Sequence, residues 1–200
     1  MICALVLAAG QSRRMGTQKL LLPLEGQPMI VHVVDELLRS PVDQIFVVIG
    51  EEGKQISEAI AGRRVHVVTN AHAEGEMLSS VRCGLIAIPD ECAGVLVALG
   101  DQPSITADVV ERLVRALRTT GRGIVVPTYR GQRGHPLLLA MHYRNEILTR
   151  YENVGLHGLL QAHPEDVLGV EVAAPGILED MDVPEDYRRT IGRFSNRLHR

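Results

Sequence analysis

Cationic and hydroxyl side chains follow directly on the first apolar run of this 200-residue chain. The run Leu5–Ala9 stops at Gly10, and the loop from there to Lys19 is rich in hydrogen-bond donors and contains no acidic residue. Backbone N–H groups approach a phosphate closely where glycine leaves out the Cβ atom, and arginine and lysine neutralise its charge. We therefore predict a triphosphate-binding loop, with ligand contacts from Gly10, Gln11, Ser12, Arg14 and Lys19.

This loop is neither of the two common nucleotide-binding loops. A Walker A loop has the pattern G-x-x-x-x-G-K-[ST], whereas five residues separate Gly10 from Gly16 here and Lys19 comes three positions after Gly16. The dinucleotide fingerprint G-x-G-x-x-G is also absent from the sequence. The residues alone leave one alternative open, which is a solvated basic turn after an edge strand.

Acidic residues at two other places could bind a metal ion. Asp101 follows the apolar run Val95–Leu99, and a carboxylate at the end of a strand beside a phosphate loop suits magnesium, although a turn before Pro103 is the alternative. The second acidic group spans Glu179–Asp186, where the bare sequence favours capping of a helix that begins near Pro184.

Composition restricts the classes of protein that fit. The chain is 46% apolar and 22% charged with a formal net charge of −3, so we expect a soluble globular protein without a nucleic-acid partner. No apolar run approaches the roughly 20 residues that span a membrane, and no basic segment precedes the first apolar run as in a signal peptide. Three cysteines without a C-x-x-C pair argue against a zinc or disulfide framework. A cytoplasmic location without membrane contact is the expectation.

The elements that must position these groups alternate along the chain. Buried strands are predicted at 2–7, 45–49, 65–68, 95–99, 124–126 and 167–172, and helices at 29–38, 54–60, 76–88, 105–117, 143–150, 155–162 and 184–191. This alternation predicts a single-domain, Rossmann-like three-layer α/β/α fold with a mostly parallel sheet. The domain is expected to cover 1–192, followed by a basic and flexible tail over 193–200.

Ligands of such folds bind at the carboxyl ends of the strands. The loops Gly10–Lys19, Asn70–Gly75 and Gly100–Pro103 should therefore converge on one site. A polar segment, Tyr129–Pro136, precedes the apolar run Leu137–Ala140, and together they predict a small hairpin over that site.

The pattern L-A-A-G-x-S-x-R-M-G-x-x-K, present as Leu7–Lys19, resembles the signature of nucleotidyltransferases that activate sugars, isoprenoid precursors and molybdopterin. Over about residues 2–188 the chain is similar to the MobA-like nucleotidyltransferase family, and within it to the molybdenum-cofactor cytidylyltransferase branch. The resemblance implies the nucleotide-diphospho-sugar transferase fold. It also implies magnesium-dependent nucleotidyl transfer to a phosphorylated acceptor, with release of pyrophosphate.

The resemblance also assigns roles to residues outside the loop. The family's G-D-x-P motif makes Asp101 a metal ligand, and its D-[IVM]-D-[TV]-P-x-D motif matches Asp180–Asp186, which makes Asp182 the second magnesium ligand with Asp180 beside it. Arg14, Lys19 and Asp101 would be the catalytic residues. The base and the rest of the nucleotide would contact Leu7, Ala8, Ala9, Asn70, Gly75 and Ser80, although the family's glycine often lies one residue nearer the Ser-Val pair than Gly75 does.

Acceptor and base follow from the same resemblance. The G-H-P motif of the cytidylyltransferase branch implies that Gly134, His135, Pro136 and also Asn153 face the acceptor, while a purely structural histidine is the alternative. The methyl group of Ala9 would narrow the base pocket relative to the L-A-G-G of guanylyltransferases. We therefore expect CTP rather than GTP, a molybdopterin-type acceptor and a client molybdenum enzyme as a further partner.

Three rival functions remain at this point. The chain could guanylate molybdopterin, could act on a sugar 1-phosphate, or could be a non-catalytic nucleotide-binding chaperone for molybdenum enzymes. The presence of Arg14, Lys19, Asp101 and Asp182 speaks against the last of these.

Overall fold

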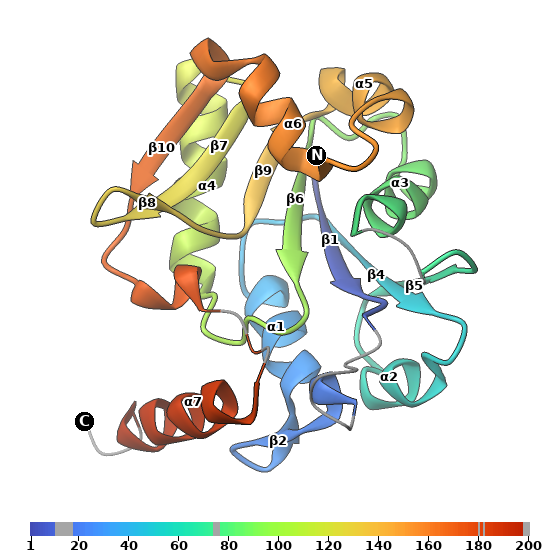
Figure 1. Cartoon of the computed structure of the whole chain (residues 1–200), viewed down its shortest axis with the longest axis vertical. Coiled ribbons are helices and arrows are strands. Elements are labelled where there is room, and N and C mark those ends of the chain that lie inside the picture. The colour runs from blue at the N-terminus through green and yellow to red at the C-terminus, as the bar shows by residue number, and fades with distance from the viewer. Residues whose placement is uncertain (11–17, 74–76, 180, 182, 198–200) are drawn as a thin grey trace.

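The computed structural model describes residues 1–10, 18–73, 77–179, 181 and 183–197, without the side chains of 193 and 195–197. Within this part of the chain, one eight-stranded sheet has the order β10-β7-β9-β6-β1-β4-β5, with β8 paired to β7 (Figure 1). The strands are β1 (Ile2–Ala8), β4 (Gln44–Gly50), β5 (His66–Asn70), β6 (Gly94–Leu99), β7 (Ile124–Tyr129), β8 (Gln132–Arg133), β9 (Leu137–Ala140) and β10 (Val167–Glu171). A separate short pair is formed by β2 (Pro23–Leu24) and β3 (Gln27–Pro28).

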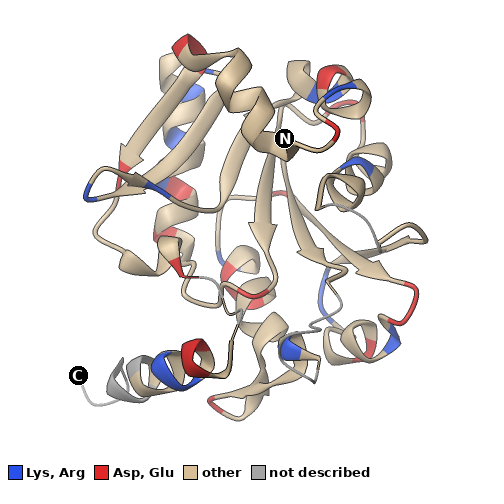
Figure 2. Ribbon diagram, viewed as in Figure 1, with Lys and Arg blue, Asp and Glu red and all other residues tan. Residues whose placement is uncertain are grey.

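Most neighbouring strands run parallel, as the sequence predicts. β1 pairs in parallel with both β4 and β6, β4 with β5, and β10 with β7, whereas β9 is antiparallel to β6 and β7. Every residue of β6 is buried, which is typical of a central strand covered on both faces. Figure 2 shows that charged residues lie mainly on the helices and loops, while the central strands are nearly free of them.

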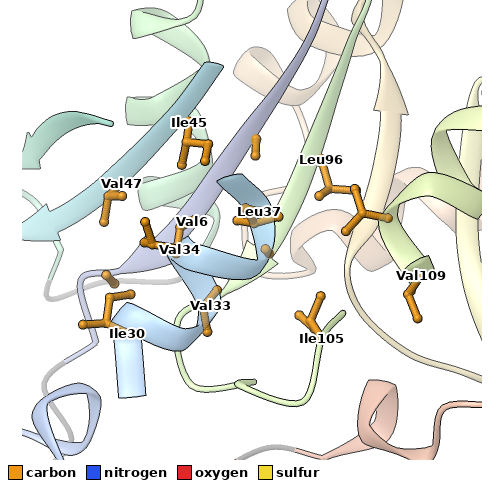
Figure 3. Close-up of a cluster of buried hydrophobic side chains, with 14 of the residues drawn as sticks. Val6, Ile30, Val33, Val34, Leu37, Ile45, Val47, Leu96, Ile105 and Val109 are labelled. Carbon is orange, nitrogen blue, oxygen red and sulfur yellow. The ribbon is translucent and has the colours of Figure 1, made fainter. Parts of the chain in front are cut away.

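Helices cover both faces of the sheet and separate two hydrophobic clusters. One face packs against α1 (Met29–Leu38), α2 (Lys54–Ala59) and α4 (Ala107–Thr120), and Figure 3 shows part of this cluster. The other face packs against α3 (Met77–Ala87), α5 (Arg144–Thr149) and α6 (Gly155–Ala162). Side chains of β1 alternate between the clusters: Val6 belongs to the first and Leu5 to the second, as the two-residue period of a strand requires.

Short 3-10 turns and one C-terminal helix complete the fold. The turns are η2 (Lys19–Leu21), η3 (Met141–Tyr143), η4 (Pro164–Asp166) and η5 (Pro175–Leu178), and α7 covers Pro184–Arg197. α7 continues beyond residue 192, where we expected the domain to end, and its Phe194 is buried with its ring 5.8 Å from that of His32. Within the described residues, none of the helices combines the length and hydropathy needed to cross a membrane.

The predicted hairpin differs from the observed one in one respect. The turn at Arg130 and Gly131 has positive φ angles of 50° and 78° and joins β7 to β8, but the apolar run after it enters the main sheet as β9. Leu137, Leu138 and Leu139 are all buried, so both faces of this segment are covered. A continuous apolar run is what a strand in the interior of a sheet needs, and this run therefore lies in the sheet rather than over the site.

Candidate functional site

The carboxyl ends of β1 and β6 approach each other closely. The amide of Gly100 donates to the carbonyl oxygen of Leu7 at 3.0 Å, and a Cβ atom on Gly100 would lie only 3.0 Å from the same oxygen. Glycine therefore allows the loop after β6 to continue directly beside the end of β1. This packing brings Asp101 next to the start of the predicted phosphate loop.

Lys19 connects three segments of the chain. Its ammonium forms an ion pair with the carboxylate of Asp101 and donates to the carbonyl oxygen of Met181 at 2.9 Å. The two charged side chains are only 14% and 15% exposed, so their interaction is less screened by water than a surface pair. Two residues predicted to be catalytic are thus in direct contact.

The segment that carries the second predicted metal ligand also reaches this place. Asp180 and Asp182 lie outside the described residues, but Met181 between them is in contact with Lys19. On the other side, the amide of Val183 donates to the carboxylate of Asp186 at 3.0 Å. Met181 and Val183, the described residues on either side of position 182, are thus each held by a hydrogen bond.

The start of α7 has a second contact to the segment that carries Lys19. The hydroxyl of Tyr187 donates to the carbonyl oxygen of Pro23 in β2 at 2.5 Å. Because Lys19 and Pro23 are close in sequence, residues 19–24 meet residues 181–187 at two points. Tyr187 was not among the predicted site residues, because its acceptor is a backbone oxygen and no residue type signals such a contact.

The oxygen atoms around Lys19 suit a cation. A carboxylate and a backbone carbonyl both bind its ammonium group, and oxygen ligands of these kinds are those that magnesium accepts. Among the described residues, no three His, Cys, Asp or Glu side chains are grouped to hold a metal ion. Asp101 and the neighbouring segment therefore fit a magnesium site only if a residue such as Asp182 completes it.

A cavity of about 370 Å³ lies at the carboxyl ends of β1, β4 and β5. Its walls include the predicted residues Ala8, Ala9, Gly10 and Asn70. At Gly50 a Cβ atom would sit 3.5 Å from both the carbonyl oxygen of Ala9 and the Cβ atom of Ala73, so these three residues meet at one wall. This size is within the range of small-molecule pockets.

Asn70 and Ser80, two of the residues predicted to bind the nucleotide, bind each other. The side-chain amide of the buried Asn70 donates to the hydroxyls of Ser79 and Ser80 at 3.0 and 3.1 Å, and its oxygen accepts from the amide of His72 at 3.0 Å. These bonds connect β5 to the first turn of α3 and shape the pocket wall. Gln11, Ser12, Arg14 and Gly75 lie outside the described residues.

Two acidic residues of this pocket were not among the predicted site residues. Glu51 and Glu52 follow β4 directly and line the cavity. The rule that ligands bind at the carboxyl ends of parallel strands could have identified them, because β4 ends at Gly50.

The backbone of the G-H-P motif donates hydrogen bonds to β7 and to the turn η5. The amide of Gly134 donates to Pro127 O and the amide of His135 to Ile177 O, each at 3.0 Å. A Cβ atom on Gly134 would lie 2.2 Å from Ile177 O, so only glycine permits this approach. The motif therefore fixes η5, the turn that leads to Met181.

Asn153 is placed in another loop. It lies exposed between α5 and α6 with a φ of 65°, a left-handed conformation that asparagine tolerates better than most residues. Arg82 of α3 holds this loop by donating to Ile147 O at 3.0 Å and to Arg150 O at 2.7 Å. The loop that carries Asn153 is therefore held by α3, whereas the G-H-P motif is bonded to η5.

Comparison with known proteins gives both partial and full-length similarities. Residues 4–167 match the model of the MobA-like NTP transferase domain. The bifunctional protein GlmU of Mycolicibacterium paratuberculosis is 37% identical over 133 residues, which are 62% of this chain and 27% of GlmU. The chain therefore spans only about a quarter of the length of that relative.

Two further proteins are similar over nearly their whole length. The molybdenum cofactor cytidylyltransferase of Escherichia coli is 27% identical over 195 residues, 97% of each chain. The crystal structure of Rv0371c from Mycobacterium tuberculosis superposes with a TM-score of 0.80 at 27% identity, covering 96% of this chain and 98% of that one. A second structure of Rv0371c is a complex with manganese.

The family match includes most of β1, both residues of the Lys19–Asp101 pair and the G-H-P motif. The full-length relatives extend the similarity through the C-terminal segment at Met181. The chain therefore belongs to the MobA-like NTP transferase family.

Proposed function

We propose that this protein transfers the nucleotidyl group of a nucleoside triphosphate to a phosphorylated acceptor and releases pyrophosphate. The observation that carries the proposal is the contact of Lys19 with both Asp101 and Met181 at the carboxyl ends of the strands. In this reaction the acceptor phosphate attacks the α-phosphorus, the bond to the β,γ-phosphates breaks, and pyrophosphate leaves.

The base would occupy the cavity between Ala9, Gly50 and Ala73, and the triphosphate would extend toward Lys19. Lys19 stabilises the negative charge that develops on the α-phosphate and on the leaving pyrophosphate, and Arg14 is proposed to assist it. A phosphate monoester has a second pKa near 6, so the attacking group is largely ionised at neutral pH. Positioning and charge stabilisation then suffice without a strong general base.

Asp101 and Asp182 would hold a magnesium ion, which when bound neutralises charge on the phosphates. Two facts support a divalent metal. The oxygen atoms of Asp101 and Met181 already bind a cation, the Lys19 ammonium. A relative with 24% identity has been solved as a complex with manganese.

CTP and a molybdopterin-type acceptor are our specific proposal for the substrates, with a molybdenum enzyme as the receiver of the product. The full-length similarity to the E. coli molybdenum cofactor cytidylyltransferase supports it, and Ala9 is among the residues that line the cavity, where a methyl group would favour a smaller base over a larger one. The partial similarity to GlmU leaves a different acceptor as the alternative.

Pyrophosphate release tests this proposal. The purified protein is given CTP, GTP, UTP or ATP with magnesium, with and without molybdopterin, and Asp101→Asn serves as the inactive control. We expect release that depends on molybdopterin and is fastest with CTP. Preference for GTP contradicts the base assignment, and the absence of release with every nucleotide and acceptor contradicts the function.

A further inference from the structure

A second cavity, of about 290 Å³, lies between the first turns of α4, residues 172–176 and α7. Figure 1 shows the segment after β10 beside the lower end of α4. Its lining shares no residue with the nucleotide cavity described above. We call it the η5 pocket, because Pro175 and Gly176 of η5 form part of its wall.

The η5 pocket is built from the two loops that meet at Lys19. Ser104 lines it three residues after Asp101, and Glu179 lines it two residues before Met181. A Cβ atom on Gly176 would lie 2.3 Å from that of Ser104, so these loops pack directly on each other. The pocket is therefore adjacent in the chain to both groups that bind the Lys19 ammonium.

The strand order places the two cavities on opposite sides of Asp101. Asp101 follows β6; the nucleotide cavity lies at the ends of β1, β4 and β5, whereas the η5 pocket lies toward β7 and β10. Phosphoryl and nucleotidyl transfer need the attacking and leaving oxygens roughly in line. A nucleotide in one cavity and an acceptor in the other would approach Asp101 from opposite directions.

The lining of the η5 pocket has the chemistry of a site for a flat heterocycle. Val109, Pro175 and Phe194 provide apolar surface, and the carboxylate of Glu179 can accept hydrogen bonds from ring N–H or amino groups. Asp108 also lines the pocket and binds Arg112 Nε at 2.9 Å.

We propose that the η5 pocket binds the heterocyclic head group of the acceptor, an N–H-bearing ring system, while the acceptor phosphate reaches Asp101. This proposal rests on the proposed function. It places the acceptor against η5, the turn that the G-H-P motif holds through the hydrogen bond from His135 N to Ile177 O. Gly134 and His135 then act on the acceptor through η5, as positioning residues.

The test fills the pocket from its exposed rim. Ala173→Trp adds an indole at a lining residue that is exposed, and Ala162→Trp, exposed at the end of α6 on the other side of the sheet, is the matched control. We expect Ala173→Trp to raise the KM for molybdopterin about tenfold or more, since the indole displaces several ligand atoms, with an unchanged KM for CTP. Ala162→Trp should leave both values unchanged.

Glu179→Gln covers the case in which the tryptophan variant does not fold. It removes the charge with little change of size, and it should weaken molybdopterin binding, measured by calorimetry without nucleotide on protein that circular dichroism shows to be folded. If an active protein keeps its acceptor KM in Ala173→Trp and its acceptor affinity in Glu179→Gln, the pocket assignment is wrong and the proposed function stands. A wild-type protein that neither binds molybdopterin nor releases pyrophosphate contradicts both.

Discussion

The ammonium of Lys19 is bound by the carboxylate of Asp101, 82 positions away in the sequence, and by the carbonyl of Met181, 162 positions away. One side chain therefore connects the loop after β1, the loop after β6 and the segment before α7. The contact makes Lys19 the natural place to test whether the meeting of these segments is functional.

Lys19→Met keeps the length of the side chain and removes its charge. We expect the rate of pyrophosphate release to fall by about 10²–10³, the usual loss when one preorganised donor to a developing negative charge is removed. Lys54→Met is the matched control, because Lys54 is 86% exposed and pairs only weakly with Glu58 at 3.8 Å. Equal rates in the two variants would exclude a catalytic role for Lys19.

Tyr187 should position the metal-binding segment. Tyr187→Phe removes the hydrogen bond to Pro23 O, and Asp186→Asn weakens the bond to Val183 N, so both variants loosen the chain beside position 182. We expect each to raise the magnesium concentration needed for half-maximal rate, with an unchanged KM for CTP at saturating magnesium. Arg188→Gln, on the exposed side of α7, is the control. A fall in melting temperature without a change in magnesium dependence would indicate a merely structural role.

The sequence was sufficient for the layered fold because apolar spacing decides it. Val6 and Leu5 face opposite helical layers, as the two-residue period of a strand requires. The central strands β1 and β6 are each a continuous apolar run, as expected of strands covered on both faces. The place of Leu137–Ala140 was harder, since a strand after a polar turn can lie over a sheet or within it. The continuous apolar run fits an interior strand, but its place between β6 and β7 follows from long-range pairing, which the local sequence does not encode.

The candidate site shows a similar division. Asp101 and Lys19 carry charges in recognisable motifs, so their contact could be anticipated. Met181 and Pro23 contribute to the candidate site through backbone carbonyl oxygens. Every residue has such an oxygen, so the residue type does not indicate the contact. Asn70 was expected at the base pocket, but its partners Ser79 and Ser80 became known only from the folding of the loop onto α3.

The G-H-P motif offers a test of side chain against backbone. Gly134→Ala places a Cβ atom against Ile177 O, so we expect η5 to shift, the melting temperature to fall and the KM for the acceptor to rise. His135→Ala keeps the amide that donates to Ile177 O and so tests the imidazole alone. An acceptor KM that rises in His135→Ala but not in Gly134→Ala would favour direct contact of the imidazole with the acceptor.

Acid should weaken the contact between Asp166 and its donors. Burial alone would raise the pKa of Asp166, but hydrogen bonds from Tyr143 Oη at 2.5 Å and Gly123 N at 2.9 Å hold this pKa below its usual value. Because the pKa is lower in the folded state, the stabilisation is present above the unfolded value of about 3.9 and is lost as the pH falls through the folded value. We expect Asp166→Asn to lower the melting temperature at pH 7 and to make it less dependent on pH below about 4. If the melting temperatures of the wild type and Asp166→Asn fell equally steeply as the pH is lowered, this explanation would be contradicted.

The hydrogen bond between Tyr143 and Asp166 also predicts a loss of protein stability at alkaline pH. Burial, together with the neighbouring Asp166 carboxylate, raises the pKa of Tyr143 above its ordinary value of about 10. A raised pKa in the folded state gives a stabilisation that is complete below about pH 10 and is lost as the pH rises through the folded value. Tyr143→Phe should therefore show less alkaline destabilisation than the wild type, followed by circular dichroism between about pH 9 and 12.

Close packing of α3 on β1 should make Gly84 sensitive to a single methyl group. A Cβ atom there would lie 2.0 Å from Leu5 Cδ1, and Leu5 is fully buried and cannot move aside without displacing the core. Overpacking of this kind costs about 1–3 kcal/mol, of which the better helix propensity of alanine offsets up to about 1 kcal/mol. Gly192→Ala is the matched control, since Gly192 lies exposed in α7 with nothing within 4 Å of the added methyl group. This variant should increase the free energy of unfolding by about 0.5–1 kcal/mol. Urea unfolding of the two variants should thus shift in opposite directions, and a stabilised Gly84→Ala would show that α3 does not pack on β1 at this distance.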